Sequence, residues 1–261
     1  MAANGRTALI TGAGKNIGRA CAHVLAQDGF NVVINGSSDR AACDRVAEEC
    51  QKLGAKALVI MGDVGKLDEC KRIAAEAAKA FGNVDALINN AALRPSKPFL
   101  ETTEEEWQRV LSVDLEGAVR LSRACLPGRV QKGWGRIVNV IGSAGRQVIP
   151  NYLVGGAANA ALINFTKGLS DLGAKHGIFV KAASPGAVAT ERWENRMKLE
   201  AKAEGRSYED VRARGSLARE YTVTYRDTLE PNERIVAGQF WRGPAAEPEV
   251  SVEKGINERT Q

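Results

Sequence analysis

Thr11-Gly12-Ala13-Gly14-Lys15-Asn16-Ile17-Gly18 follows the short apolar run Ala8-Leu9-Ile10 and leads into Arg19-Ala20-Cys21-Ala22-His23-Val24-Leu25-Ala26. A strand, a glycine-rich turn and an amphipathic helix in this order are typical of the first βα unit of a nucleotide-binding fold, where backbone N–H groups can face a pyrophosphate. The spacing differs from the fingerprint G-x-G-x-x-G, because the third glycine falls one place late, at Gly18. A glycine-rich turn also serves wherever a chain must reverse tightly, so the remaining sequence has to decide.

The composition is that of one large intracellular domain. The chain has 261 residues and a net charge of +5, with basic and acidic residues interleaved, which suits an anionic cofactor or substrate and gives no sign of nucleic-acid binding. No apolar run approaches the length of a membrane span, and no signal peptide precedes the first strand, so we expect a cytoplasmic protein. The five cysteines lack metal-ligand spacing, so we expect reduced, packed thiols and no metal site: Cys21, Cys43, Cys50, Cys70 and Cys125.

Apolar β-branched runs alternate with helical patterns from end to end. This alternation predicts a doubly wound α/β fold, a single domain over residues 1–261 with a parallel sheet of about seven strands and helices on both faces. We expect strands near 6–11, 31–35, 56–61, 84–89, 135–141, 178–183 and 250–256. We expect helices near 17–28, 40–53, 67–81, 103–126, 155–174, 191–214 and 231–241, the fourth beginning with the capping box Thr103-Glu104-Glu105-Glu106.

The end of the second predicted strand bears on the choice of cofactor. A carboxylate at this point would bind the ribose 2′-hydroxyl of NAD, but the residue here is Gly36. Lys15, Ser37 and Arg40 could instead meet a 2′-phosphate. We therefore expect NADP(H) to be favoured over NAD(H); the alternative is that these are solvated loop residues.

Three further motifs follow the glycine turn in order: Gly62-Asp63-Val64, Asn89-Asn90-Ala91-Ala92 and Ser184-Pro185-Gly186…Thr190. With them, residues 6 to 190 resemble the short-chain dehydrogenase/reductase family. The resemblance implies phosphate contacts at the turn, adenine contacts after the third strand, and cofactor contacts after the fourth and sixth. The implied cofactor-binding residues are Gly12, Lys15, Asn16, Ile17, Gly18, Asp63, Val64, Asn89, Ala91, Pro185, Gly186 and Thr190.

The sequence departs from the family at several of its positions. Asn16 stands where the family turn has a glycine, which is tolerable because Asn accepts positive φ more readily than other non-glycine residues. Ala92 replaces the glycine that usually ends the motif Asn89-Asn90-Ala91-Ala92.

Family enzymes reduce carbonyls or oxidise alcohols with a tetrad of Asn, Ser, Tyr and Lys. Laid on the family pattern without gaps, the four positions hold Asp114, Gly142, Gly155 and Asn159. The chain is thus identified as an atypical member, in which the site differs by about two charges, each worth about 3 kcal/mol at 6 Å.

Other residues could take over proton transfer. Tyr152 could lean over the space left at Gly155 as a displaced acid, or be a structural tyrosine at the helix mouth. Ser143 could offer a hydroxyl to the substrate, or only form a turn. Asp114 could act as a base or bind a cationic substrate, or could be hydrogen-bonded to Asn159 for purely structural reasons.

Loops and tail suggest further roles. Arg94, Arg146 and Arg192 follow the fourth, fifth and sixth strands and could capture an anionic substrate. Residues 191–219 form a charged helical insertion where the family has its substrate lid. The tail from 247 to 261 departs from the family ending, in a region that family dimers and tetramers use, so a homo-oligomer is an expectation by resemblance only.

Three functions stay open at this point. The first is an NADP(H)-linked oxidoreductase acting on a small carbonyl or alcohol with a non-standard proton-transfer arrangement. The second is a non-redox enzyme that uses the cavity left by Gly142 and Gly155 for elimination, hydration or cleavage. The third is a catalytically inactive cofactor-binding protein, because a shared fold does not decide function.

Overall fold

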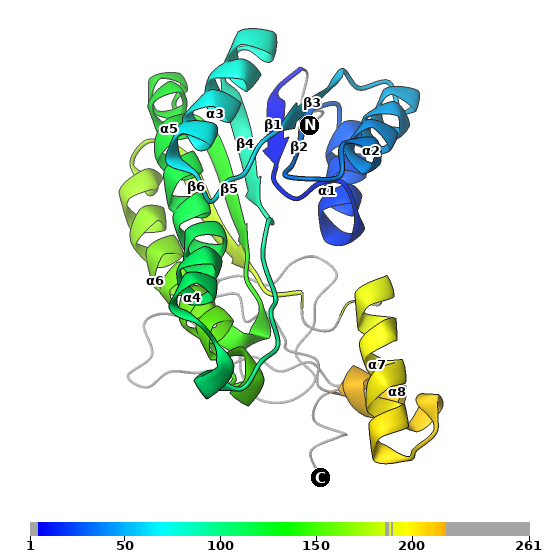
Figure 1. The fold of residues 1–261 in the computed structure, drawn as a ribbon. Coiled ribbons are helices and arrows are strands. Elements are labelled where there is room, and N and C mark those ends of the chain that lie inside the picture. Colours follow the sequence, from blue (N-terminus) through cyan, green and yellow to red (C-terminus); the bar gives the residue numbers. More distant parts are fainter. Residues whose placement is uncertain (1–4, 186–187, 189, 218–261) are drawn as a thin grey trace, which may run out of the picture. The chain divides into compact units, whose positions relative to one another are not determined.

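The computed structural model describes residues 5–185, 188 and 190–217 (Figure 1). These residues belong to one compact unit, Met1–Glu220. The helix expected near 231–241, the strand expected near 250–256 and the tail from 247 lie outside the described residues.

Six parallel strands form one sheet in the order β3-β2-β1-β4-β5-β6. The strands are β1 Thr7–Ile10, β2 Asn31–Gly36, β3 Ala57–Met61, β4 Val84–Asn89, β5 Gly135–Val140 and β6 Ile178–Ala183. This confirms the doubly wound α/β fold and places six of the expected strands. The strand order reverses between β1 and β4, and folds of this kind bind ligands at such a switch point, beyond the carboxyl ends of the strands.

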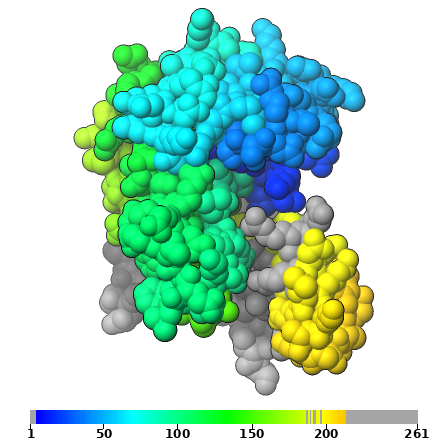
Figure 2. Space-filling model, viewed as in Figure 1, coloured from blue at the N-terminus to red at the C-terminus, as the bar shows by residue number. Residues whose placement is uncertain are grey.

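Helices cover both faces of the sheet (Figure 1). The helices α1 (Asn16–Gln27) and α2 (Arg40–Lys52) pack on one face, and α3 (Leu67–Phe81), α5 (Gly117–Lys132) and α6 (Leu153–Ala174) pack on the other. Figure 2 shows that α2, α3 and the short helix α4 (Glu104–Leu111) contribute surface on the side viewed. The remaining helices, α7 (Glu191–Glu204) and α8 (Tyr208–Leu217), have a small core of their own around Met197, Ala201 and Val211.

The strand residues alternate between the two cores. Leu9, Val33 and Leu87 face α3 and α5, while Ala8 and Ile34 face α1 and α2. This alternation is the two-residue period of a strand, and both sides are apolar because helices cover both faces. Each fully buried Leu, Ile or Val stabilises the fold by about 1.5–3 kcal/mol, before the loss of chain entropy is counted.

Two expected helices differ from the structure. The helix expected over 103–126 is α4 and α5 joined by a π-helical turn at Ser112–Glu116, and it continues through Pro127 until Gly133, whose φ of 63° ends it. The helix expected over 191–214 is two helices, because Gly205 adopts a φ of 64° and ends α7. In both cases a glycine in the left-handed region sets the boundary.

Within the described part of the chain, no helix is both long and apolar enough to cross a membrane. All five cysteines are free, and four of them are buried.

Candidate functional site

The backbone conformation and close packing of the turn between β1 and α1 require glycine or asparagine at particular positions. Gly12 has a φ of 60°, and Asn16, with a φ of 51°, is the one non-glycine residue of the described chain at positive φ. A Cβ on Gly12 would lie 3.0 Å from the Cα of Ala91, and one on Gly18 would overlap the carbonyl oxygen of Gly12. The expectation that Asn16 accepts a left-handed conformation is therefore confirmed, and the turn packs closely against the loop after β4.

Hydrogen bonds join this turn to the end of β4. The Thr11 hydroxyl oxygen accepts from the backbone N–H groups of Asn90 at 2.9 Å and Ala91 at 3.0 Å. The Asn90 amide in turn donates to the carbonyl oxygens of Thr11 at 2.9 Å and Gly12 at 3.1 Å. These bonds fix the two loops at the switch point of the sheet.

The N-terminus of α1 lacks a side-chain cap. Lys15 holds the N-cap position without a side-chain hydrogen bond, and no acidic residue occurs in the first turn. The helix α4 differs, because Thr103 and Glu106 complete the expected capping box. The first N–H groups of α1 have no partner within the helix and are suited to an anionic ligand.

Gly18→Ala is expected to lower the free energy of unfolding by about 2 kcal/mol, because the added methyl group meets backbone rather than a flexible side chain. Urea denaturation measures the change. The matched control is Gly168→Ala on the exposed side of α6, where an added Cβ has nothing within 4 Å and should raise stability by up to about 1 kcal/mol. Equal midpoints for the Gly18 variant and the wild type would contradict this account of the turn.

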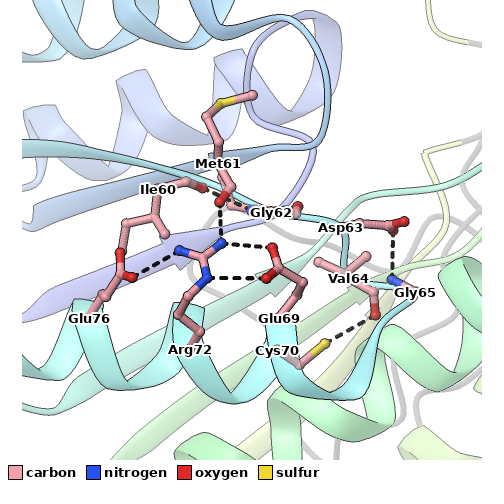
Figure 3. A network of polar contacts seen from close by, with 11 residues as sticks. Ile60, Met61, Gly62, Asp63, Val64, Gly65, Glu69, Cys70, Arg72 and Glu76 are labelled. Atoms are coloured by element: carbon pink, nitrogen blue, oxygen red, sulfur yellow. Dashed lines mark hydrogen bonds and ion pairs between the residues drawn. The ribbon is translucent and has the colours of Figure 1, made fainter.

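Arg72 braces the end of β3 (Figure 3). Its guanidinium donates to the carbonyl oxygen of Met61 at 2.6 Å and to the carboxylates of Glu69 at 2.7 Å and Glu76 at 2.9 Å. Both carboxylates come from α3, so this one side chain ties the helix to the strand that precedes it. No sequence pattern indicates this role, because Arg72 lies on an amphipathic helix among other charged residues.

Asp63 and Val64, the expected adenine contacts, lie in the turn that Arg72 braces (Figure 3). Asp63 accepts from the N–H of Gly65 at 2.9 Å and pairs with Arg109 at 2.9 Å. Burial raises the pKa of Asp63, but the bonds from Arg109 and Gly65 outweigh it and hold the pKa below its usual value. Sequence reasoning missed Arg109, which is 46 positions from its partner.

The end of β2 carries no carboxylate. Gly36 lies under α2, where an added Cβ would be 2.5 Å from the Sγ of Cys43. The next acidic residue along the chain, Asp39, caps α2 by accepting from the N–H of Ala42 at 2.9 Å. Ser37 is exposed beside it, and Arg40 is paired with Asp44 at 3.0 Å.

Asp114 lies in the π-helical turn between α4 and α5. Its Oδ1 accepts from the backbone N–H of Leu93 at 2.7 Å, and its Oδ2 is 3.4 Å from the Tyr152 hydroxyl. Burial raises the pKa of Asp114 to about 7, against the opposing effect of these two hydrogen bonds and of Arg109. Insertions of this kind in α-helices are frequent at functional sites.

Tyr152 fills the space beside Gly155. A Cβ on Gly155 would fall within the Tyr152 ring, and the buried ring carries the Arg94 guanidinium 5.4 Å from its centroid. The Tyr152 hydroxyl donates to the carbonyl oxygen of Leu93 at 2.7 Å. Leu93 thus binds Asp114 and Tyr152 through its backbone N–H and carbonyl groups. No side-chain pattern in the sequence could therefore identify it.

Asn159 and Ser143 have local bonding roles. The Asn159 amide accepts from the N–H of Gly142 and donates to the carbonyl oxygen of Gly155, both at 2.6 Å. The structure has no hydrogen bond between Asp114 and Asn159; Asp114 bonds to Leu93, and Asn159 bonds to Gly142 and Gly155. Ser143 begins a 3-10 turn, Ser143–Gly145, and its carbonyl oxygen accepts from two later N–H groups.

A pocket opens at the carboxyl ends of β1, β4 and β5. We call it the Asp114 pocket; its lining is Thr11, Val64, Asn89, Ala91, Ala92, Val113, Asp114, Gly117, Ala118, Leu121, Val140, Asn159 and Leu162. It joins expected cofactor residues to Asp114 and Asn159, two of the expected catalytic residues. Tyr152 reaches Asp114 from a second, smaller pocket that it lines with Phe99 and Trp107.

The remaining expected residues are placed only in part. Arg94 lies against Tyr152 and Arg146 is exposed, while the side chain of Arg192 is outside the described residues. The anion-capturing arginine group therefore stays a prediction. Gly186 is also outside the described residues, and Thr190 caps α7 by accepting from the N–H of Trp193 at 3.2 Å.

Comparison with known proteins gives consistent matches. The family model described as short chain dehydrogenase matches residues 6–201. A 3-oxoacyl-[acyl-carrier-protein] reductase FabG of Staphylococcus epidermidis is 32% identical over 189 residues, covering 71% of this chain and 76% of the relative. The uncharacterized oxidoreductase YohF of Escherichia coli is 33% identical over 186 residues, covering 71% of this chain and 74% of the relative.

Solved structures agree with these matches. The acetoin dehydrogenase YohF from Salmonella typhimurium has a TM-score of 0.69 at 30% identity, covering 71% of this chain and 74% of that chain. An NAD+-bound xylitol dehydrogenase has a TM-score of 0.71 at 29% identity, covering 76% of this chain and 77% of that chain.

Proposed function

This chain belongs to the short-chain dehydrogenase family, and from that membership we propose that it is an oxidoreductase that prefers NADP(H) to NAD(H) and acts on a small carbonyl or alcohol. We further propose that it is an atypical member, with Asp114, Gly142, Gly155 and Asn159 at the family's tetrad positions. The bound nicotinamide would supply or accept a hydride.

The cofactor assignment is supported by the β1–α1 turn. An uncapped helix N-terminus at the switch point of a parallel sheet, with no acidic residue in its first turn, suits a pyrophosphate. The residues that would hold the cofactor are Gly12, Lys15, Asn16, Ile17, Gly18 and Ser37 near the phosphates, Asp63 and Val64 near the adenine, and Asn89, Ala91, Pro185, Gly186 and Thr190 toward the nicotinamide.

Lys15→Ala should separate the two cofactors. We expect the dissociation constant for NADPH to rise about tenfold, because a charge-assisted bond to the 2′-phosphate is lost, while that for NADH changes less than about twofold. Fluorescence titration measures both. Lys52→Ala, at the opposite end of α2 from Gly36, is the charge-matched control. Equal losses for the two cofactors would refute the assignment of Lys15 to the 2′-phosphate.

Proton transfer is assigned to the Asp114–Tyr152 pair, and one observation carries it: a buried carboxyl group with a pKa of about 7 lines the pocket and lies 3.4 Å from a tyrosine hydroxyl. A general acid or base works best with a pKa near the working pH. Asp114 would exchange the proton with the substrate, and Tyr152 would hold Asp114 and Leu93 in position.

The deciding experiment is titration with NADPH, NADP+, NADH and NAD+, followed by nicotinamide absorbance against a panel of carbonyls and alcohols. Binding at micromolar concentrations with turnover is the expected result. Absence of binding would overturn the proposal.

A non-catalytic cofactor-binding role is the second candidate. The Tyr152 hydroxyl favours it, because that hydroxyl already donates to the carbonyl oxygen of Leu93. Gly142 favours it too, because a glycine at the family's serine position has no hydroxyl to offer a substrate. Binding without turnover of any panel member would select it. Product formation without an absorbance change would instead select a non-redox reaction.

A further inference from the structure

The Asp114 pocket has one charged side chain in its described lining, that of Asp114 itself. Two side-chain donors in the lining are engaged within the protein: the Thr11 hydroxyl donates to the Ile88 carbonyl oxygen, and one of the two N–H groups of the Asn159 amide donates to the carbonyl oxygen of Gly155. A ligand therefore meets a carboxyl group and no side-chain cation in this part of the pocket.

A chain of buried hydrogen bonds ends at the same pocket and has a fixed direction. The Leu162 carbonyl oxygen can only accept, so the Thr166 hydroxyl donates to it at 2.6 Å. Thr166 Oγ1 then accepts from Asn139 Nδ2 at 2.8 Å, and Asn139 Oδ1 accepts from Asn89 Nδ2 at 2.8 Å. Each amide is oriented by the one before it.

Asn89 Oδ1 is the acceptor at the end of this series of hydrogen bonds. This atom is buried and has no hydrogen-bond partner among the described residues, and Asn89, at 6% exposure, lines the pocket. A buried acceptor without a donor costs stability, so a ligand that supplies an N–H group gains on binding.

The reduction of a carbonyl group needs hydrogen-bond donors in the pocket, whereas Asn89 Oδ1 is an acceptor. A ketone oxygen accumulates negative charge as it accepts hydride, so it needs donors or a cation around it. In the described lining it would meet no cation; its side-chain donors would be the protonated form of Asp114 and the second N–H of the Asn159 amide, and it would lie near the Asn89 acceptor. A protonated C=N group supplies both a positive charge and an N–H donor.

We propose that this pocket takes a small imine, bound as its iminium ion between Asp114 and Asn89, and that the chain reduces its C=N bond in preference to a C=O bond; the inference rests on the oxidoreductase function proposed above. Asp114 would be a catalytic residue and Asn89 a specificity-determining one.

The reaction balances with the cofactor already proposed. The imine nitrogen binds protonated or takes the proton of the Asp114 carboxyl group, and the imine carbon takes a hydride from the reduced nicotinamide. The C=N bond becomes a single bond, with one new C–H and one N–H bond in the amine. The imine gains two electrons and the nicotinamide loses two.

Binding tests the proposal without turnover. At pH 8 the probes are 2-methylpyrrolidine, which is then an ammonium ion, and the neutral 2-methylcyclopentanol, titrated calorimetrically with and without NADP+. We expect the amine to bind at least about tenfold more tightly than the alcohol, and Asp114→Asn to remove that advantage. The matched control is Asp68→Asn, an exposed carboxylate on α3.

Turnover separates this inference from the proposed function. With NADPH, 2-methyl-1-pyrroline should have a kcat/KM at least about tenfold above that of 2-methylcyclopentanone. A preference for the ketone, or an alcohol that binds as tightly as the amine, overturns the imine assignment and leaves the oxidoreductase proposal standing. Failure to bind any nicotinamide cofactor overturns the oxidoreductase proposal. If Asp114→Asn does not fold, the wild-type ratio of amine to alcohol affinity decides.

Discussion

Gly155→Tyr, which would restore the family's tyrosine position, is expected to lower the free energy of unfolding by about 3–5 kcal/mol. The Cβ of the new side chain would fall within the ring of Tyr152. Tyr152 would have to leave a site where it is 7% exposed and where its hydroxyl donates to Leu93 at 2.7 Å. The variant therefore loses the burial of one aromatic ring and leaves a backbone carbonyl without its donor. Urea denaturation with the wild type as reference measures the loss.

The same clash predicts rescue by a second substitution. Tyr152→Ala alone should cost about 3 kcal/mol, but combined with Gly155→Tyr it removes the ring that the new side chain meets. The double variant should therefore be more stable than the sum of the two changes by about 2 kcal/mol or more. Gly142→Ser is the matched control, since a Cβ there is 3.5 Å from Asn159 and in ordinary contact. Additive losses would show that the two positions do not compete for space.

The sequence predicted those parts of the fold that depend on local pattern. The strands β4 and β6 and the helix α3 have the expected bounds, because apolar alternation and helical periodicity are properties of neighbouring residues. The nearness of Tyr152 to Gly155 was equally local, being three positions apart at a helix mouth. Helix α5 continued beyond its expected end because tertiary packing tolerated Pro127 within it.

The parts that escaped prediction depend on contacts distant in the chain. Leu93 binds Asp114 and Tyr152 through its backbone N–H and carbonyl groups, which any residue type offers. The pair of Asp63 and Arg109 joins two turns that only the folded sheet brings together. The direction of the hydrogen bonds that end at Asn89 can be assigned only when all of their partners are known. No single residue of this series predicts the direction from the sequence.

The free energy of unfolding should fall as the pH rises, through Asp114. Burial raises the pKa of this carboxyl group to about 7 in the folded protein, whereas the unfolded chain has a value near 3.8. Between these values the folded state holds a proton that the unfolded state has released, so the stability present below pH 4 is lost progressively until the pH passes about 7. From pH 5 to pH 8 the expected loss is about 3 kcal/mol.

Asp114→Asn isolates this effect, because its amide cannot ionise and can still meet the Leu93 backbone. The difference in unfolding free energy between the variant and the wild type should therefore grow in favour of the variant from pH 5 to pH 8 and level off above it. Asp63→Asn is the opposite control: the pKa of Asp63 is held low, so its ionised form stabilises the fold, and that contribution is lost as the pH falls. Parallel curves for Asp114→Asn and the wild type would mean that Asp114 is already ionised at pH 5, and both its role as an acid near neutral pH and its raised pKa would have to be given up.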